Sequence, residues 1–563
     1  MTVNKLTIYQ VLIRLFGNKN NTNKPNGTLL ENGVGKFDDF TFEALSSIKD
    51  MGFSHIWYTG VLEHATQTDY SAYGIENDCP AIVKGIAGSP YAIKDYYDVD
   101  PDLAENIQSR KKEFESLITR THQSGLKVII DFVPNHVARV YKSDSKPGWI
   151  TDLGECDDSQ FAFLPQNNFY YIPGTMLCPR FNISGIDNEY VEYPAKATGN
   201  DRFDAFPERN DWYDTVKLNY GVDYCGGHIK YFDPIPPTWH QMLDILKYWT
   251  QKGVDGFRCD MAEMVPVEFW EWAIPQVKEI NNKVLFIAEV YNPLEYRNYL
   301  FNGKFDYLYD KVGLYDTLKS VICHNHSTLE ITGCWQQLEG IQKKMLNFLE
   351  NHDEQRIASD FFAKDPVKAI PALIVSFLMN TNPVMVYFGQ ELGERGMDAE
   401  GYSGCDGRTT IFDYWSVDTI RRWNNDGKFN NDRLTEKELN LRDLYIKVVN
   451  VCKNEKAISD GRFFDLMYAN TNNVHFDYNR VYAFMRGDER EVVLVAANFA
   501  DYPQNLDLWI PRHAFEYFKI PEGVSLETVD LLSGEKGQFV LEESLPLCIS
   551  VDSNSAIVVK MTW

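Results

Sequence analysis

Three acidic residues each come at the end of a short, mainly apolar run. Asp260 ends the segment GFRCD, Glu289 lies in FIAEV and Asp353 ends LENHD. Carboxylates at the ends of buried strands would converge on one mouth of a barrel. Two carboxyl groups about 5–5.5 Å apart can attack an anomeric carbon and protonate the leaving oxygen, which breaks a glycosidic bond. Adjacent strands lie about 4.8 Å apart, so Asp260 and Glu289 meet this requirement if their strands are neighbours.

The residue types beside Asp260 favour the same chemistry. Side chains two positions apart on a strand share a face, so Arg258 is expected next to Asp260. A guanidinium there keeps the carboxylate ionised, as a nucleophile must be. A lone acid at a strand end is more often a helix cap or a surface group. The prediction therefore rests on the three acids together.

The elements that must position these acids follow an alternating pattern of strands and helices. Helical patterns cover residues 42–51, 114–122, 239–249 and 267–274. Strands are predicted at eight apolar runs, residues 6–13, 53–58, 126–133, 254–259, 284–288, 307–309, 345–349 and 384–388. This order is typical of a (β/α)8 barrel, an α/β fold.

Two segments fall outside that pattern. About 100 residues rich in Asn, Asp, Gly and Pro separate the third strand from the fourth, which is too long for an unstructured loop. We therefore expect an inserted subdomain at residues 137–238, within a barrel formed by residues 1–136 and 239–457. Residues 458–563 have short strand-like runs parted by turn residues. They predict a C-terminal antiparallel β-sandwich domain.

Composition limits the partners and the location. The 563 residues carry 55 basic and 80 acidic side chains, a net charge of −25. That charge repels phosphate backbones and anionic lipids, so neither nucleic acid nor a membrane is expected as a partner. The ten cysteines form no CxxC pair and predict free buried thiols. With no signal peptide in this sequence, the cytoplasm is the expected location, unless a leader has been trimmed.

The segments DFVPNH (131–136), GFRCD, FIAEV and LENHD, in this order, resemble the signature regions of the α-amylase family of glycoside hydrolases. The resemblance spans the barrel, includes the long insertion after the third strand and extends into the C-terminal domain. It implies that Asp260 is the nucleophile and Glu289 the general acid/base. It also implies that Asp353 binds sugar hydroxyls and stabilises the transition state.

The same resemblance implies further sugar-binding residues. His136 and His352 resemble two histidines that hydrogen-bond the sugar before the cleaved bond, and Arg258 resembles the partner of the nucleophile. Tyr91, in SPYAIKDYY, resembles a tyrosine that stacks on that sugar. Arg408, in CDGRTTIFDYW, resembles a more distant sugar-binding arginine.

Two departures from the family pattern bear on substrate and metal. Asp260 is followed by Met-Ala-Glu-Met where endo-acting members have a Lys-His pair three and four residues on, so shorter, cyclic or branched maltodextrins are more plausible than long starch. Asn135 matches a ligand of a structural calcium, but Lys217, in TVKLN, stands where a second ligand would be an aspartate. An ammonium cannot ligate Ca²⁺. Lys217 is therefore expected to tie the insertion to Asn135 in the cation's place.

The sequence thus predicts a retaining α-glucan hydrolase acting on α-1,4 bonds of maltodextrins, with no cofactor required for the chemistry. A transglycosylase or an α-1,6-acting enzyme of the same family is the alternative, because the first chemical step is shared. A second alternative, from a different functional class, is a sugar-binding relative without catalytic activity. Such a protein should lack one or more of the three acids. An α-glucan oligosaccharide is the expected partner, and the sequence does not indicate the oligomeric state.

Overall fold

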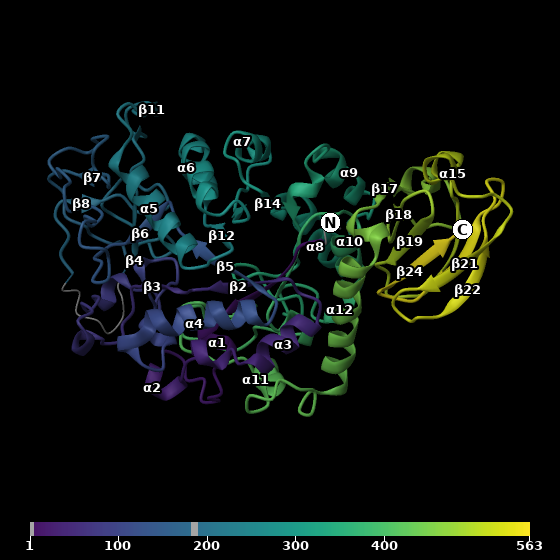
Figure 1. Ribbon diagram of the computed structural model, residues 1–563, viewed down its shortest axis with the longest axis horizontal. Coiled ribbons are helices and arrows are strands. Elements are labelled where there is room, and N and C mark those ends of the chain that lie inside the picture. The colour runs from purple at the N-terminus through teal and green to yellow at the C-terminus, as the bar shows by residue number, and fades with distance from the viewer. Residues whose placement is uncertain (1–4, 182–189) are drawn as a thin grey trace.

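A closed barrel of eight parallel strands forms the centre of the molecule. The computed structural model describes residues 5–181 and 190–563. The barrel strands are β1 (Thr7–Leu12), β2 (His55–Thr59), β5 (Lys127–Phe132), β12 (Gly256–Cys259), β13 (Leu285–Ala288), β14 (Tyr307–Tyr309), β15 (Met345–Leu346) and β16 (Val384–Tyr387). They pair in the order β15-β14-β13-β12-β5-β2-β1-β16, and a parallel bridge between Asn347 and Val384 joins the two ends of this sheet. Figure 1 shows the strands β2, β5, β12 and β14 in the central part of the molecule. The predicted (β/α)8 barrel is confirmed.

Helices on the outside connect the strands. Their apolar faces pack against the barrel and cover it. The longer ones are α3 (Phe42–Asp50), α4 (Arg110–Gln123), α5 (Pro237–Gln251), α6 (Val267–Ile280), α8 (Asp316–His324), α9 (Glu330–Gln337), α10 (Ile370–Leu378) and α12 (Glu436–Asn454). Short helices complete the connections: α1 (Ile13–Phe16), α2 (Leu29–Asn32), α7 (Tyr296–Phe301) and α11 (Asp418–Asn424). One hairpin was not predicted: β3 (Leu62–His64) and β4 (Ile93–Val99) pair antiparallel between β2 and α4. The loop between its strands carries Tyr91.

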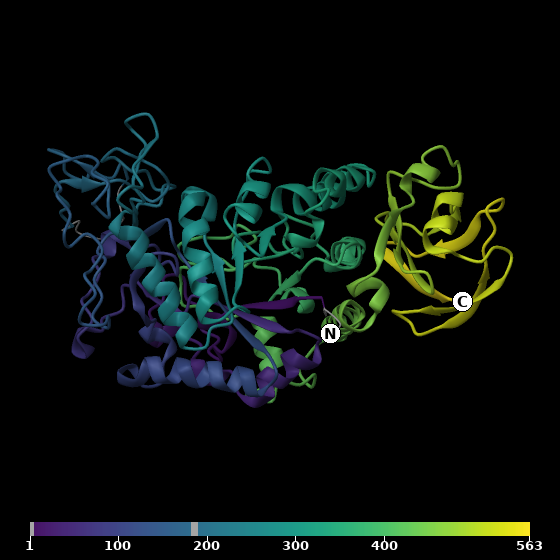
Figure 2. The ribbon, with the colours of Figure 1, turned by 45° about the horizontal axis from the view of Figure 1, so that its top comes forward.

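The predicted insertion lies between β5 and α5. In its described residues, 137–181 and 190–238, the regular structure consists of short antiparallel pairs. They are made by β6 (His136–Ala138), β7 (Tyr171–Ile172), β8 (Ala195–Lys196), β9 (Thr215–Lys217), β10 (Val222–Asp223) and β11 (Ile229–Lys230). The pairing of β6 with β9 brings this later part of the insertion back to its beginning, which follows β5 in the chain. This subdomain and the C-terminal domain lie at opposite ends of the molecule (Figure 2).

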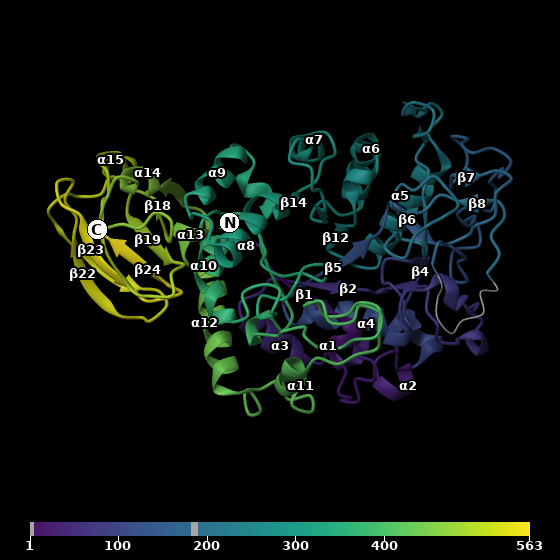
Figure 3. The ribbon, with the colours of Figure 1, turned by 180° about the vertical axis from the view of Figure 1, so that it is seen from behind.

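The C-terminal domain has two antiparallel sheets, as predicted. One sheet has the order β17-β18-β19-β24-β21-β22 and the other pairs β20 with β23. The strands are β17 (Arg462–Asp465), β18 (Val481–Gly487), β19 (Glu491–Asn498), β20 (Gln504–Leu508), β21 (Ser525–Asp530), β22 (Lys536–Val540), β23 (Leu547–Val551) and β24 (Ser555–Thr562). The helices here are α13 (Lys456–Ser459), α14 (Met467–Asn470) and α15 (Arg512–Phe518). Seen from behind, α12 runs between the barrel and this domain (Figure 3).

Two further observations concern the chain as a whole. Within the described residues, each helix is too short or too polar to traverse a bilayer. All ten cysteines are free, but Cys156, Cys178, Cys225, Cys405 and Cys548 are exposed, so the expectation of buried thiols is wrong for half of them. Four of them lie in loops, and Cys548 lies on β23 of the C-terminal domain.

Candidate active site

One buried arginine holds three carboxylates together at the mouth of the barrel. Arg258 Nη1 lies 2.7 Å from Asp260 Oδ1 and 3.4 Å from Asp131 Oδ1, while Nη2 lies 2.7 Å from Glu289 Oε2. Arg258 Nε also donates to the Tyr309 hydroxyl over 3.2 Å. The predicted contact between Arg258 and Asp260 is confirmed. The guanidinium also binds Glu289, which the spacing within one strand does not indicate.

The backbone explains why the three predicted acids converge. Asp260 follows β12 and Glu289 follows β13, and these strands pair in parallel with their ends in register. Asp353 lies in the loop after β15, on the same rim. All three acids line one pocket of about 270 Å³. The carboxyl ends of barrel strands thus deliver the acids to one cavity, as expected for this fold.

The pKa values of Asp260 and Glu289 are both raised by their surroundings. Burial raises the pKa of Asp260, and the Arg258 charge opposes that rise. Burial also raises the pKa of Glu289, to about 7, with Arg258 again opposing and the charges of Asp260 and Asp353 adding to the rise. The expectation that Arg258 favours the ionised form of Asp260 holds for the direction of its effect, but desolvation is the larger cause. A carboxyl with a pKa near 7 suits proton transfer in both directions at neutral pH.

Asp353 has the opposite electrostatic character. Partial desolvation acts to raise its pKa, but His352, Arg258 and Arg408 together lower it to about 2. His352 Nε2 lies 3.0 Å from Asp353 Oδ2 and 2.5 Å from the Tyr91 hydroxyl. The rings of Tyr91 and His352 stack at 5.1 Å. The lowered pKa favours the anionic form of Asp353 at neutral pH, and its side chain is 42% exposed.

The amide of Gln10 fixes the proton of His352. Gln10 Nε2 donates to His352 Nδ1 over 2.8 Å, so the ring proton belongs on Nε2, which faces Tyr91 and Asp353. The Tyr91 hydroxyl also donates to Asp131 Oδ1 over 3.3 Å. Tyr91 thus lines the pocket, while the His352 side chain, which is 0% exposed, lies behind Tyr91 and holds it in place.

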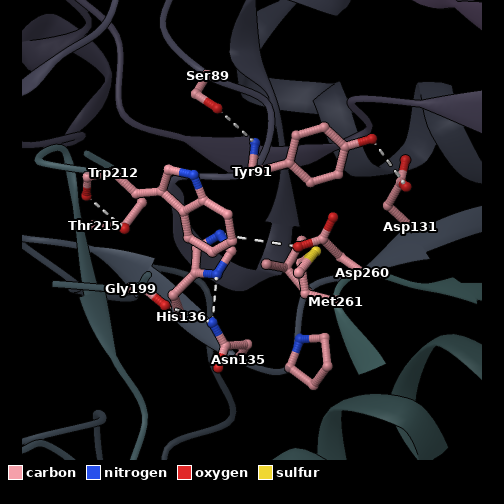
Figure 4. A network of polar contacts seen from close by, with 12 residues as sticks. Ser89, Tyr91, Asp131, Asn135, His136, Gly199, Trp212, Thr215, Asp260 and Met261 are labelled. Atoms are coloured by element: carbon pink, nitrogen blue, oxygen red, sulfur yellow. Dashed lines mark hydrogen bonds and ion pairs between the residues drawn. The ribbon is translucent and has the colours of Figure 1, made fainter. Parts of the chain in front are cut away.

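The opposite wall pairs His136 with an aromatic residue of the insertion. His136 Nε2 lies 4.0 Å from Asp260 Oδ2, and the Trp212 ring packs against the imidazole at 5.0 Å (Figure 4). Burial lowers the pKa of His136 to about 3, so the ring is neutral. The Asn135 amide contacts Nδ1 at 3.2 Å, which leaves the proton on Nε2, toward the pocket. His136 is therefore a neutral hydrogen-bond donor beside the carboxylate.

The segment after Asp260 does not carry the basic pair and instead positions Glu289. Met261 has a positive φ of 42°, a strained conformation for a side chain of this type, and its N–H donates to Glu289 Oε2 over 2.9 Å. Glu263 accepts from the backbone N–H groups of Tyr291 and Asn292 over 3.1 Å each. The two strand ends are thereby joined, and the Tyr291 hydroxyl reaches Glu289 Oε1 at 2.5 Å.

Replacing Tyr291 by Phe is expected to move the basic limb of the pH profile of kcat/KM upward by about half to one pH unit. The hydroxyl donates to Glu289 and lowers its pKa, and one hydrogen bond to a charged group contributes about 1.5 kcal/mol, with about 1.4 kcal/mol per pKa unit. Without it the acid stays protonated to higher pH. Tyr296→Phe is the matched control, because that buried hydroxyl finds no hydrogen-bond partner among the described residues. A downward shift in Tyr291→Phe would contradict the assignment.

Arg408, which the sequence predicted to bind sugar, lies outside the pocket that the three acids line. Its side chain is 50% exposed and its guanidinium lies 3.4 Å from Asp406 Oδ2. It does not line the pocket, although its charge contributes to the lowered pKa of Asp353. Arg408 therefore lies at the outer rim, where a longer ligand would be needed to reach it.

The residues around Asn135 do not fit a calcium ion. Lys217 Nζ donates to Asn135 Oδ1 over 2.6 Å and to the Met264 carbonyl over 3.3 Å, and it lies 2.5 Å from Asp201 Oδ1. The Lys217 side chain is only 1% exposed. A positive charge from the chain itself therefore lies among the oxygens that a cation would need. It joins the insertion to the loop after Asp260.

Replacing Lys217 by Met should lower the free energy of unfolding by about 3 kcal/mol, because removing one partner of a buried ion pair leaves the other groups uncompensated. Urea denaturation of the whole chain measures this. Lys343→Met removes an exposed lysine and serves as the control, with a change under about 0.5 kcal/mol. Equal losses in the two variants would show that Lys217 does not tie the insertion to the barrel.

Sequence reasoning missed several residues of the pocket. Tyr291 had a usable signal, since it is two positions after Glu289 and shares its direction. Trp212 lies three residues before TVKLN, but only the pairing of β6 with β9 brings it to His136. Ser89, Thr215, Ile411 and Phe412 lie in the segments SPYAIKDYY, TVKLN and CDGRTTIFDYW, but nothing in those segments distinguishes them as lining residues. Lys84 and Asp214 line the pocket from outside these segments.

Comparison with known proteins agrees with this geometry. Residues 10–167 and 236–459 match the family model described as "Alpha amylase, catalytic domain". The chain is 21% identical over 468 residues to α-amylase 2 of Dictyoglomus thermophilum, which covers 82% of this chain and 64% of that protein. The chain therefore spans less than two thirds of that relative's length.

Solved structures match over the whole length of the chain. A noncanonic maltogenic α-amylase, AmyB from Thermotoga neapolitana, aligns with a TM-score of 0.63 at 18% identity, covering 100% of both chains. An α-amylase from Geobacillus thermoleovorans, solved with acarbose, aligns with a TM-score of 0.64 at 18% identity and covers 100% of this chain and 99% of that one. At this identity the structures show a shared fold, while the family model covers most of the sequence. The chain belongs to the α-amylase family of glycoside hydrolases.

Proposed function

We propose that the chain is a retaining α-glucan hydrolase that cleaves α-1,4-glucosidic bonds of maltodextrins, including cyclic or branched ones. The observation that carries the proposal is the guanidinium of Arg258, which lies 2.7 Å from both Asp260 and Glu289 beside the pocket that Asp353 also lines. Two carboxyls on adjacent strands with a third acid opposite them are the groups that a double-displacement reaction needs.

The first half of the proposed reaction forms a covalent bond. Asp260 Oδ1 is held by Arg258, so Oδ2 attacks the anomeric carbon. As the glycosidic bond breaks, Glu289 gives its proton to the leaving oxygen. Asp353, whose pKa is lowered to about 2, is a carboxylate at neutral pH that binds sugar hydroxyls and stabilises the positive charge that develops on the sugar. The products are a glycosyl ester on Asp260 and a shortened glucan with a new hydroxyl.

The second half reverses the role of Glu289. Its carboxylate takes a proton from a water molecule, and the resulting hydroxide attacks the anomeric carbon and releases Asp260. Burial and neighbouring charge place the pKa of Glu289 at about 7, so the same group can give and accept the proton. In a transglycosylase, a sugar hydroxyl would replace this water with no change in the residues used.

The substrate class is proposed from the walls of the pocket. Tyr91, with His352 stacked behind it, lines the pocket, and so do Trp212 and His136, whose rings pack against each other. Aromatic faces and neutral donors suit a sugar ring, which has apolar faces and a rim of hydroxyls. The solved relative from Geobacillus thermoleovorans was crystallised with acarbose, which supports an oligosaccharide ligand here. The proposed partner is therefore an α-glucan oligosaccharide.

Incubation with maltoheptaose, followed by proton NMR of the first products, tests the proposal. We expect shorter maltooligosaccharides whose new reducing ends appear first as the α-anomer and then mutarotate. Products longer than the substrate would assign the chain to transglycosylation. Cleavage of pullulan at α-1,6 bonds with no cleavage of maltoheptaose would assign the α-1,6 specificity. First release of the β-anomer would contradict the retaining mechanism.

A further inference from the structure

Four acidic side chains meet outside the active-site pocket, at the base of the hairpin β3–β4. They are Glu63 on β3, Asp95 and Asp98 on β4, and Asp144 in the insertion. One carboxylate oxygen from each lies within 4.8 Å of the corresponding oxygen of every other. Glu63, Asp95 and Asp98 are 2% exposed or less, while the side chain of Asp144 is 29% exposed. Carboxylates gathered this closely repel one another unless a cation or protons compensate them.

The chain supplies too few positive charges for this cluster. Arg110 Nη2 lies 2.6 Å from Asp98 Oδ2 and 3.7 Å from Asp144 Oδ2. The nearby Lys94 is directed instead to Asp78, 3.1 Å away. One arginine therefore serves two of the four acids directly. Glu63 and Asp95 have no ion pair of their own among the residues that the structure describes.

A second observation points to a ligand: the buried carboxylate of Glu63 lacks a partner. In the described part of the chain nothing donates a hydrogen bond to Glu63 Oε2, although this atom is inaccessible to solvent. Leaving a buried carboxylate oxygen without a partner is unfavourable, so Glu63 favours a ligand at this place. Glu63 also contributes one of the oxygens with which the four acids meet.

We propose that Glu63, Asp95, Asp98 and Asp144 bind a divalent cation, and that this cation is calcium. Calcium takes oxygen ligands at about 2.3–2.6 Å, so oxygens around one ion are up to about 4.6–5.2 Å apart, twice that bond length. The four oxygens, which all lie within 4.8 Å of one another, are close enough to share one calcium ion. Magnesium usually keeps several waters and binds only one or two carboxylates, so four carboxylates fit calcium better. The exposed side of Asp144 leaves access for the ion and for the waters that complete its coordination.

Such an ion would stabilise one wall of the substrate pocket. The loop between β3 and β4 carries Tyr91, and Asp144 belongs to the insertion that carries Trp212. An ion shared by Glu63, Asp95 and Asp144 joins these two parts at a point away from the catalytic acids. Burial also raises the pKa of Glu63 well above its usual value and that of Asp95 to about 7, which a bound cation would reverse. The inference does not depend on the proposed activity.

Calcium titration of the chelator-treated full chain tests the inference by calorimetry and by thermal melting. We expect one calcium ion per chain and a rise in Tm of about 3 °C or more at millimolar calcium. Glu63→Gln should weaken calcium binding at least tenfold. Asp144→Asn, at a partly exposed position that folding tolerates, should weaken it as well and decides the matter if the first variant does not fold. Glu105→Gln changes an exposed acid near β4 and should bind calcium like the unchanged chain.

Two results would overturn the inference. The first is absence of calcium binding at millimolar concentration, with Glu63→Gln as stable as the unchanged chain, which would mean that Glu63 is a neutral, protonated acid. The second is calcium binding of the same strength in Glu63→Gln and Asp144→Asn, which would place the ion elsewhere.

Discussion

Asp260→Asn is expected to lower kcat on maltoheptaose by at least about 10⁴-fold, equivalent to about 5.5 kcal/mol of activation free energy. The amide keeps the size of the side chain and still accepts a hydrogen bond from Arg258, 2.7 Å away in the unchanged chain. It cannot form the glycosyl ester, so the covalent route is closed. Because the pocket walls are unaltered, the Kd for a maltooligosaccharide, measured by calorimetry, should change by less than about tenfold.

The matched control for this variant is Asp214→Asn. Asp214 lines the same pocket but is paired with Lys84 at 3.2 Å and has no contact with Arg258 among the described residues. The same chemical change there should lower kcat by less than about tenfold. If Asp260→Asn retained more than about 1% of the turnover, or if both variants lost activity equally, Asp260 would not be the nucleophile.

Glu289→Gln is expected to lower kcat on maltooligosaccharides by about 10²–10⁴-fold, the usual contribution of general acid–base catalysis. In the unchanged chain the acid must be protonated for the first step. Its pKa is raised to about 7, so the rate should fall as pH rises through that value. The glutamine cannot lose a proton, so the basic limb of the pH profile should disappear in the variant.

A substrate that needs no acid separates this role from a structural one. Fluoride leaves without protonation, so α-glucosyl fluoride should release one equivalent of fluoride rapidly in Glu289→Gln and then react slowly. Azide needs no general base, so adding it should restore turnover and give the glucosyl azide of retained configuration. Absence of both the burst and the azide effect would mean that Glu289 does not transfer the proton.

The barrel was predictable because its strands are buried on both faces. Each of the eight strands lies within a predicted apolar run or overlaps it within a few residues. The hairpin β3–β4 was not predicted, since Leu62–His64 is too short to give a pattern. In the C-terminal domain, β18 and β19 are buried along almost their whole length, but β22 (Lys536–Val540) is a largely exposed edge strand without apolar alternation. Buried strands therefore have an apolar pattern that the sequence reveals, whereas exposed strands do not.

In the active site, too, some features could be predicted from the sequence and others needed the folded structure. The sequence indicates the catalytic acids and Arg258 because strand parity and motif order act over a few residues. The contact between Arg258 and Glu289 needs the pairing of β12 with β13, and the pairing of His136 with Trp212 needs the folded insertion. For Arg408, the motif resemblance indicated a sugar-binding residue, but only the structure showed that its half-exposed side chain lies outside the pocket. Electrostatics also needed the structure, because desolvation outweighs Arg258 at Asp260.

Trapping the covalent intermediate tests the central claim most directly. A 5-fluoro-α-glucosyl fluoride slows both steps by destabilising the positive charge on the sugar, while the fluoride leaving group favours formation of the ester, which accumulates. Mass spectrometry of the intact chain should then show one added fluoroglucosyl group, and peptide mapping should place it on Asp260. An adduct on Glu289, Asp353 or any other residue would contradict the account, as would turnover through the β-anomer with no adduct.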